Sequence, residues 1–497
     1  MDLFLEGLQV ITRLDVFIAL FVGAIGGVII GAIPGVGAGV AIAIILPATF
    51  QFDAIVGLTL LLGIYGAAMY GGAIPAILIN TPGTPVNALT TYDGYPMSCN
   101  GESRRALSLA YSSSFFGGVF SVICLILITP FLASIAPMFG SRDIFMAALL
   151  GTIMVIVSHR GRALAAGMLM SFGIFLNTVG LEMIQFSHRY TFGMMGIISG
   201  IELIPVLIGL FAISQAFILL VNADDRPDIP KIKGGSFFQG FSELFRHKKV
   251  ATISAGFGVI MGIIPGVGEF LAQFFSYSLA QVFSKKPEMF GKGAPEGIIA
   301  SETANNAVPA AAMIPLLSLG IPGEVLTAMM LSVFYVHNII PGPALFQTRP
   351  EFPISLYICL LVINVIIFIF LLFTTNTILH IIRIPTRFLG IFILTLGLIG
   401  VYSIRNSFVD CVIGVIFGVL GYILKRLNLP VVPIILGMVL GRIMDDKLKN
   451  SMARIETPLD MIDRPISGTI FGIIILVLIV HFIILYRERR ALSKPND

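Results

Sequence analysis

The sequence predicts an all-α polytopic membrane protein with roughly 11 to 14 helical spans, several broken into half-helices, arranged as two homologous, inverted repeats. Three observations predict this class: the composition, a series of long apolar runs, and a pair of motifs that occurs twice. Of the 497 residues, 57% are hydrophobic and only 12% are charged. Soluble domains carry about 25% charged residues, so this chain has too few charges to cover a surface facing water. Disorder and collagen are excluded, and a net charge of +4 is too dilute to indicate nucleic-acid binding.

The apolar runs are long enough to cross a membrane, because a hydrocarbon core about 30 Å thick needs about 20 residues of helix. In the first half of the chain the runs are Leu14–Ile33, Ala54–Ile79, Ala106–Ile135, Ile144–Val157, Ala163–Leu181 and Ile197–Val221. In the second half they are Val250–Ile264, Ile298–Leu319, Val325–Ile340, Ile354–Ile382, Phe388–Val401, Cys411–Leu424, Val431–Leu440 and Ile466–Leu485. The runs are continuously apolar and do not alternate, which disfavours a transmembrane β-barrel.

Polar segments divide and orient the chain. Lys and Arg accumulate in cytoplasmic loops, so we expect the basic stretch Asn222–Lys249 and the basic tail Arg487–Asp497 in the cytoplasm. The expected organisation is a first transmembrane repeat (1–221), a cytoplasmic basic loop (222–249), a second transmembrane repeat (250–445), and a final helix with its tail (446–497). Inverted repeats then place the N-terminus outside.

Two motifs recur in the same order. Gly31–Gly37 (GAIPGVG) returns as Gly262–Gly268 (GIIPGVG), 231 positions later. Pro82-Gly83 returns as Pro322-Gly323, 240 positions later, and the difference fits an insertion around Phe283–Gly293. Two motifs that keep their order and nearly their spacing indicate an internal duplication.

Each motif places Pro-Gly inside an apolar run, where proline removes an amide donor and glycine loosens the backbone, so the helix breaks. Broken backbone at membrane depth is tolerated where it is buried in protein or lines a wet cavity. Its carbonyl groups can bind a cation, and the following half-helix presents amides to an anion. Paired breaks in corresponding halves point to a transporter's binding site. The alternative is a pair of packing kinks, since Gly27, Gly31 and Gly35 also form a helix-packing face.

Three carboxylates lie close to the second pair of breaks. A carboxylate at membrane depth costs about 2.5–3.5 kcal/mol on insertion scales, so one retained there indicates function. We expect Glu302, which precedes Asn305 and Asn306, to be an ion or proton ligand, although an interfacial loop position is the alternative. Glu269 and Glu324 directly follow the breaks and are further candidate proton or ion ligands. Capping of a helix dipole could also account for these two.

Motifs for other classes are missing from the sequence. Neither a GxSxG elbow, an HExxH helix nor a GxxxxGK[ST] loop occurs, which argues against a hydrolase or an ATP-driven pump. The four cysteines lie far apart, so neither a disulfide framework nor a metal site is expected. We therefore expect a carrier driven by an ion gradient, without enzymatic activity or an organic cofactor. The first alternative is a membrane channel, and the second, less favoured one is a membrane-embedded enzyme.

Longer stretches of the chain resemble a known family. They are Gly31–Gly37, Tyr70–Pro85 (YGGAIPAILINTPGTP), Asp93–Met97 (DGYPM), Gly262–Gly268, Phe290–Gly297 (FGKGAPEG), Glu302–Ala307 (ETANNA), Ile314–Gly323 (IPLLSLGIPG) and Pro341–Pro343 (PGP). In this order they resemble the large permease subunit of tripartite tricarboxylate transporters (TctA-type), over nearly the whole chain.

The resemblance implies a multi-pass protein of the bacterial inner membrane, with a cytoplasmic C-terminus, that imports citrate-like or related carboxylates. It implies Na⁺ or H⁺ as the coupling cation, and a small membrane subunit and a periplasmic solute-binding protein as partners. The family usually has a small residue where this chain has Glu269 and Glu324. Added negative charge there disfavours a highly charged tricarboxylate unless a cation or proton offsets it.

The resemblance also transfers a site onto this sequence, in which half-helix N-termini and amides hold the anion and freed carbonyls hold the cation. The expected residues are Pro34, Gly35, Gly37, Asn80, Thr81, Gly83 and Thr84 from one repeat, and Gly266, Gly268, Glu302, Asn305, Asn306, Gly320 and Gly323 from the other. A rocking or elevator movement would expose the site to the two sides in turn.

Overall fold

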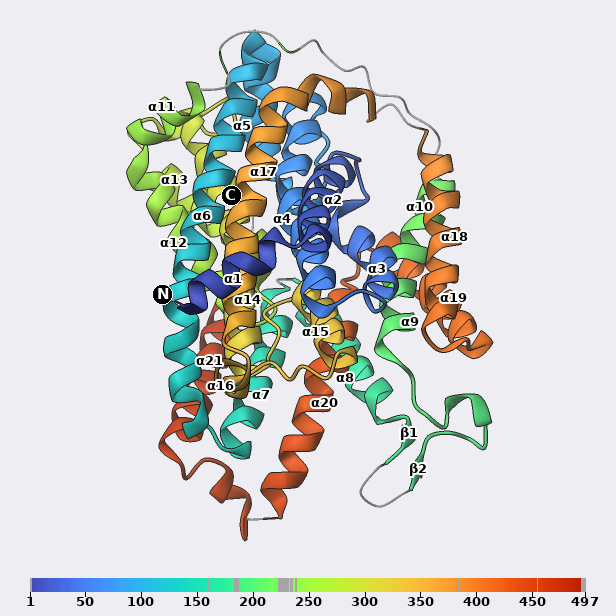
Figure 1. Cartoon of the computed structure of the whole chain (residues 1–497). Helices are drawn as coiled ribbons and strands as arrows, with labels where there is room; N and C mark the ends of the chain where they lie inside the picture. Colours follow the sequence, from blue (N-terminus) through green and yellow to red (C-terminus); the bar gives the residue numbers. More distant parts are fainter. Residues whose placement is uncertain are drawn as a thin grey trace. The chain divides into compact units, whose positions relative to one another are not determined.

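The computed structural model describes residues 2–492 except 160, 183–186, 222–231, 233–235, 237–238, 382–384 and 454. Most of the expected basic loop 222–249 and the end of the C-terminal tail lie outside the described residues. The described chain is helical apart from one antiparallel pair of short strands, β1 (Gly180–Leu181) and β2 (His188–Arg189) (Figure 1). In this part of the chain, 9 helices are long and apolar enough to cross a membrane, beside three shorter apolar helices. The all-α polytopic class is confirmed.

The chain forms two compact units, the first from Met1–Ser134 and Glu202–Asn428, the second from Ile135–Ile201 and Leu429–Asp497. The first contains α1 (Asp2–Thr12), α2 (Leu14–Gly31), α3 (Gly37–Thr49), α4 (Ala54–Ile79), α5 (Thr90–Met97), α6 (Ser103–Ile135), α9 (Leu203–Ile208), α10 (Ser214–Val221), α11 (Gln239–Arg246), α12 (Lys248–Ile263), α13 (Gly268–Phe283), α14 (Pro295–Leu319), α15 (Val325–Val336), α16 (Pro343–Thr348), α17 (Glu351–Ile381), α18 (Thr386–Arg405) and α19 (Phe408–Arg426). The second contains α7 (Ser141–Ser158), α8 (Ala163–Thr178), α20 (Val432–Met452) and α21 (Pro465–Leu492).

Some spans end elsewhere than their apolar runs suggest. The run Ala163–Leu181 stops being helical at Thr178, because its last residues enter β1. In the run Ile197–Val221 the helix starts at Leu203 and contains one π-helical turn, Gly209–Ile213. Helix α20 continues well past the end of its apolar run, to Met452, through a polar segment in which Lys449 pairs with Asp445 one turn earlier. Hydropathy marks the membrane-embedded part of a helix, and the helix itself can be longer or shorter.

Helices α2 and α4 pack in parallel through small residues. A Cβ atom on Gly23 would lie 2.6 Å from the Leu60 carbonyl oxygen, and Gly31 lies against Ala68 further along both helices. Helix α3 then turns back, because Gly57, near the start of α4, contacts Thr49 at the end of α3. Helices α2 and α3 therefore form a re-entrant hairpin. Its tip lies opposite Ala68, about 17 Å short of the end of α4 at 1.5 Å per residue.

The second repeat builds the same hairpin from α12 and α13. Gly258 and Gly262 of α12 pack against α14 in the order that gives a parallel pair. Helix α13 returns along α14, where the Ser276 hydroxyl donates to the Ala300 carbonyl at 3.0 Å. The duplicated sequence thus has a duplicated structure.

The two repeats are inverted. Gly94 of α5 contacts Ile77 near the C-terminal end of α4. The neighbouring Asp93 accepts a hydrogen bond of 2.8 Å from the amide of Ala294, which caps the N-terminus of α14. The end of α4 and the start of α14 are therefore on the same side, so these equivalent helices run in opposite directions. Figure 1 shows α3 and α13 on either side of α4.

Gly71 and Gly66 both lie in α4, but only Gly71 packs closely against α2. Gly66 therefore serves as the control for a substitution at Gly71. A Cβ atom on Gly71 would overlap the carbonyl oxygen of Val28, whereas one on Gly66 would meet nothing within 4 Å. We expect Gly71→Ala to destabilise the protein by about 1–3 kcal/mol through overpacking, and Gly66→Ala to be harmless. Thermal unfolding in detergent and membrane abundance measure both. Equal behaviour of the two variants would contradict the close α2–α4 contact.

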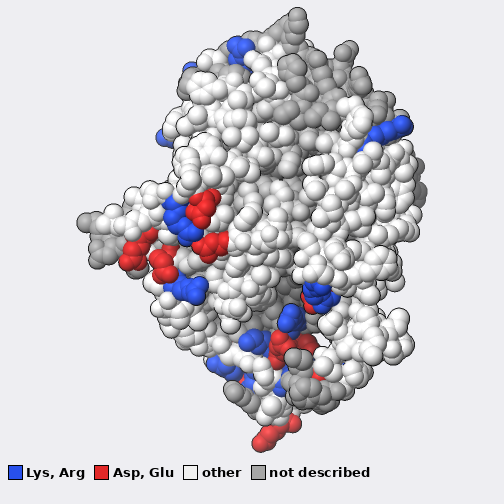
Figure 2. All heavy atoms as spheres, turned by 45° about the vertical axis from the view of Figure 1, so that its right-hand side comes forward, with Lys and Arg blue, Asp and Glu red and all other residues white. Residues whose placement is uncertain are grey.

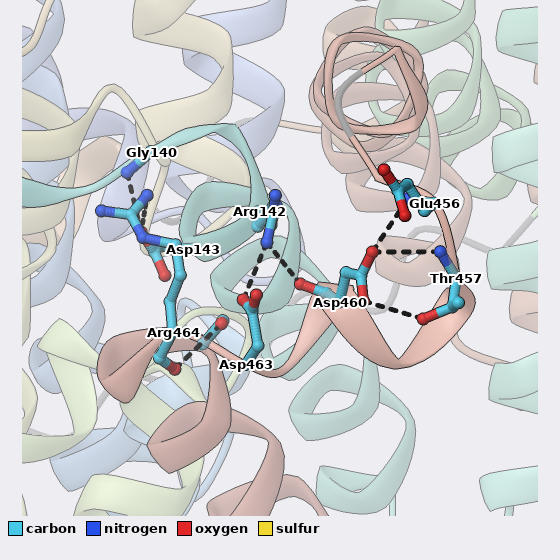
Figure 3. A network of polar contacts seen from close by, with 9 residues as sticks. Gly140, Arg142, Asp143, Glu456, Thr457, Asp460, Asp463 and Arg464 are labelled. Carbon is cyan, nitrogen blue, oxygen red and sulfur yellow. Dashed lines mark hydrogen bonds and ion pairs between the residues drawn. The ribbon is translucent and has the colours of Figure 1, made fainter.

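A polar network joins the start of α7 to the segment before α21 in the second unit (Figure 3). Arg142 donates to the Asp460 carbonyl and to the Asp463 carboxylate, at 2.6 and 2.7 Å. Arg464 pairs with the buried Asp143 at 2.9 Å. Hydrogen bonds from the backbone and side chain of Thr457 lower the pKa of Asp460. These contacts fix the connection between α20 and α21.

Many large apolar side chains are exposed in the described part of the chain. Figure 2 shows a face on which charged side chains form a few small groups among uncharged atoms. On α21, Leu476 and Phe482 are 59% and 65% exposed. Such a surface suits contact with lipid acyl chains.

Candidate substrate and ion site

The two hairpin tips have the same backbone geometry. Gly35 and Gly266 have φ of 82° and 79°, and Gly37 and Gly268 have φ of 63° and 67°. This left-handed region favours glycine. The amide of Gly35 donates to the Gly83 carbonyl at 3.1 Å, and the amide of Gly266 donates to the Gly323 carbonyl at 2.7 Å. The structure thus joins the two predicted Pro-Gly motifs of each repeat.

The ends of α4 and α14 are also equivalent. Asn80 and Gly320 cap them in the left-handed conformation, with φ of 54° and 71°. The side chains of Asn80 and Thr81 are exposed, and the Thr81 hydroxyl donates to the carbonyl of Ile79. Both therefore lie at the accessible end of α4, apart from the buried residues around Glu302.

Glu302, on α14, is 0% exposed and lies among neutral donors. Its Oε1 accepts from the Thr90 hydroxyl and, at 3.1 Å, from the Asn87 amide. Its Oε2 accepts from the Ser114 hydroxyl at 3.0 Å and the Asn306 amide at 3.4 Å. We call these five residues the Glu302 cluster. Because the four donors are uncharged, they orient the carboxylate without neutralising it, so it is suited to bind a proton or a cation.

The first repeat enters the cluster through Asn87. This amide also donates to the Met69 carbonyl at 3.0 Å and accepts from the Thr84 hydroxyl at 2.5 Å. Thr84, a predicted site residue, therefore acts through Asn87. The inverted arrangement brings elements 215 positions apart into direct contact, since Asn87 bonds to Glu302.

Sequence reasoning noted Asn87 and Thr90 among the polar residues of the first break without selecting them as site residues, and it missed Ser114. Asn87 and Thr90 stand beside the first break and carry no motif of their own. Ser114 ends a run of three serines inside an otherwise apolar span, which is a usable signal that this helix packs against other helices in the membrane.

Asn305 is fully buried, and neither its amide nitrogen nor its carbonyl oxygen has a hydrogen-bond partner. The Thr303 hydroxyl and the Asn306 carbonyl oxygen are also buried and unpaired. A buried polar group without a partner costs about 1–3 kcal/mol. Groups retained at such a cost inside a membrane-embedded helix are suited to hold a ligand.

Glu269 and Glu324 are each 8% exposed. Glu269 lies in the first turn of α13 and accepts from the Tyr65 hydroxyl at 3.0 Å. Glu324 caps α15 together with Thr327, yet its Oε1 is buried without a partner. Dipole capping and a free coordinating oxygen therefore coexist at Glu324.

Asp93 connects the two repeats beside the cluster. Its Oδ1 accepts from the amides of Gly291, Gly293 and Ala294 at 2.8 to 2.9 Å. Its Oδ2 accepts from the Tyr277 hydroxyl at 2.8 Å. The carboxylate is fully buried, so it holds the start of α14, and with it Glu302, in place.

We expect Asp93→Asn to destabilise the protein by about 1.5–3 kcal/mol, because the variant loses charge-assisted hydrogen bonds to the 291–294 loop. Limited proteolysis should cleave this loop faster than in wild type. Asp463→Asn is the control, since Asp463 is 57% exposed in its side chain and an exposed ion pair contributes little. Unchanged cleavage in Asp93→Asn would show that the loop is held by other contacts.

Inverted helix breaks around buried, partly unpaired polar groups define the class of this protein: a multi-pass membrane transport protein with broken helices at its centre. The chain belongs to the tripartite tricarboxylate transporter TctA family, whose model matches residues 17–436. It is therefore a transporter and not an enzyme, and part of a system with other subunits.

Two relatives come from Agrobacterium vitis. One, described as an uncharacterized 52.8 kDa protein in the TAR-I ttuC' 3'region, is 32% identical over 471 residues, which cover 95% of this chain and 94% of that protein. The other, an uncharacterized protein in the TAR-II ttuC' 3'region, is 32% identical over 235 residues, which cover 47% of this chain and 97% of that protein. No solved structure matches the chain.

Proposed function

We propose that this chain is the permease subunit of a secondary active transporter that imports carboxylate anions with Na⁺ or H⁺. The observation that carries the proposal is the Glu302 cluster: a fully buried carboxylate surrounded by neutral donors, next to the unpaired amide of Asn305. A coupled carrier needs a cation or proton site in contact with its substrate site. A buried, unneutralised carboxylate meets that need.

The proposed partners are a small membrane subunit and a periplasmic solute-binding protein that delivers the anion. The proposed location is the bacterial inner membrane, with the C-terminus in the cytoplasm. Family membership supports a tripartite assembly. In the proposed cycle, the two hairpin tips and the Glu302 cluster hold anion and cation together, and their movement as a group exposes the site to each side in turn.

The test is uptake into vesicles from cells that express the complete three-part system. Labelled citrate, malate, succinate and acetate are each supplied with and without an imposed Na⁺ or H⁺ gradient, and with and without this subunit. We expect saturable uptake that requires both the subunit and one of the gradients. Conductance without saturation would indicate a channel instead, and no uptake of any compound with all three parts present would contradict the proposal.

A further inference from the structure

The two hairpin tips differ in charge although they share their backbone. The first turn of α13 contains Glu269, whereas the equivalent position in α3 is Ala38. Similarly, Glu324 in the second repeat corresponds to Thr84 in the first. Helix α3 has neither an acidic residue in its first turn nor a side-chain cap. The positive end of its dipole is therefore not offset, and it favours an anion.

A basic group lies close to this tip. A Cβ atom on Gly35 would lie 3.4 Å from Nε2 of Gln215, a residue of α10 that is 8% exposed. Lys425, on α19, donates from Nζ to Oε1 of Gln215 at 3.2 Å and to the Phe211 carbonyl at 3.5 Å. Both partners are neutral, so they do not offset the charge of Lys425.

The lysine also fixes the direction of the Gln215 amide. An ammonium group can only donate, so the amide oxygen must face Lys425. The NH₂ group of Gln215 therefore faces the break at Gly35. Gly35 itself is exposed, although Ile33 and Val36 beside it are buried, so the break is accessible to a ligand.

The repeat relation predicts a third donor. Val86 and Leu326 are equivalent positions, and each contacts the half-helix of the other repeat: Val86 accepts from Gln273 of α13, and Leu326 contacts Gly39 of α3. Tyr65 contacts Glu269 in the first turn of α13, and Asn305 is the position equivalent to Tyr65. The same exchange therefore predicts that Asn305 lies near the first turn of α3. The unpaired Asn305 amide is thereby expected to face the same break.

We propose that the first-repeat break binds a carboxylate of the transported anion, with Lys425 and Gln215 as its recognition residues. The first-turn amides of α3 and the amide of Asn305 are further donors to the same group. The inference rests on the proposed function and deepens it, since it assigns the anion to the first-repeat tip. The second-repeat tip has the acidic residues Glu269 and Glu324 at the equivalent positions, where a cation or a proton is the better-suited ligand.

The experiment uses the complete three-part system and whichever of labelled citrate, malate, succinate or acetate the wild type takes up. Lys425→Gln removes the charge. Gln215→Glu keeps a partner for Lys425 but neutralises it and places a carboxylate against the break. Arg426→Gln is the matched control, because Arg426 is the next residue, is exposed, and contacts Tyr422 instead. Membrane abundance is measured for each variant.

We expect Lys425→Gln and Gln215→Glu each to raise KM for the anion about tenfold or more at normal abundance, and Arg426→Gln to leave KM unchanged. Lys425→Arg should restore part of the affinity. A wild-type KM in Gln215→Glu would overturn the proposal. A lysine that only contacts lipid phosphates or stabilises the fold would accept a glutamate partner without a change in KM. If the wild type itself takes up none of the four anions, the proposed function and this inference both fail. Wild-type uptake with unaffected variants contradicts the inference alone.

Discussion

Replacing Glu302 by glutamine is expected to reduce uptake per transporter molecule by at least about 100-fold, because a unit charge near a bound cation contributes several kcal/mol. The glutamine side chain also cannot accept all the hydrogen bonds that the carboxylate accepts. Asn87 donates to one carboxylate oxygen and Asn306 to the other, so the new NH₂ group faces a donor in either orientation. Initial rates of labelled uptake, normalised to membrane abundance, measure the effect.

Glu296→Gln is the matched control for this variant. Glu296 lies in the first turn of the same helix, is half-buried and contacts His247 at 3.5 Å, away from the donors of the Glu302 cluster. We expect it to transport at nearly the wild-type rate. Glu302→Asp, which keeps the charge on a shorter side chain, should keep measurable uptake. Rapid, gradient-dependent uptake by Glu302→Gln would remove Glu302 from the site.

Asn305→Ala is expected to abolish uptake without lowering membrane abundance. Both amide atoms of Asn305 are buried without a partner, so removing them breaks no hydrogen bond and relieves an unfavourable desolvation of about 1–3 kcal/mol. Part of that gain is offset by the small cavity that alanine leaves. The expected combination is full loss of transport with an unchanged or slightly higher unfolding temperature, as occurs when binding groups are kept at the expense of stability.

Asn364→Ala provides the contrast. Asn364 accepts from the Tyr70 hydroxyl and donates to the Leu360 carbonyl, each at 2.8 Å, so its removal leaves buried partners unsatisfied. It should lower the unfolding temperature. If Asn305→Ala lowers the unfolding temperature as much as Asn364→Ala, or transports with wild-type kinetics, the assignment of Asn305 to the site is wrong.

The sequence alone was sufficient to predict the membrane class, the duplication and the four breaks. Apolar runs and Pro-Gly pairs act locally: a long apolar run must enter the bilayer, and a proline followed by glycine must interrupt the helix wherever it lies. The breaks at Gly35 and Gly266 consequently occur at the predicted residues. Span ends were less predictable, as the π-helical turn at Gly209–Ile213 shows, because packing against neighbouring helices decides them.

Only the tertiary structure decided which polar residues meet. Asn80 and Glu302 were both expected in the site, yet Asn80 is an exposed helix cap and Glu302 is the buried centre of a hydrogen-bonded cluster. Lys425 follows the end of an apolar run and belongs to no motif, and the fold places it against Gln215 beside the first hairpin tip. The physical reason is that helix breaks are set by residues adjacent in the chain. Partners such as Asn87 and Glu302 come together only when the inverted repeats pack against each other.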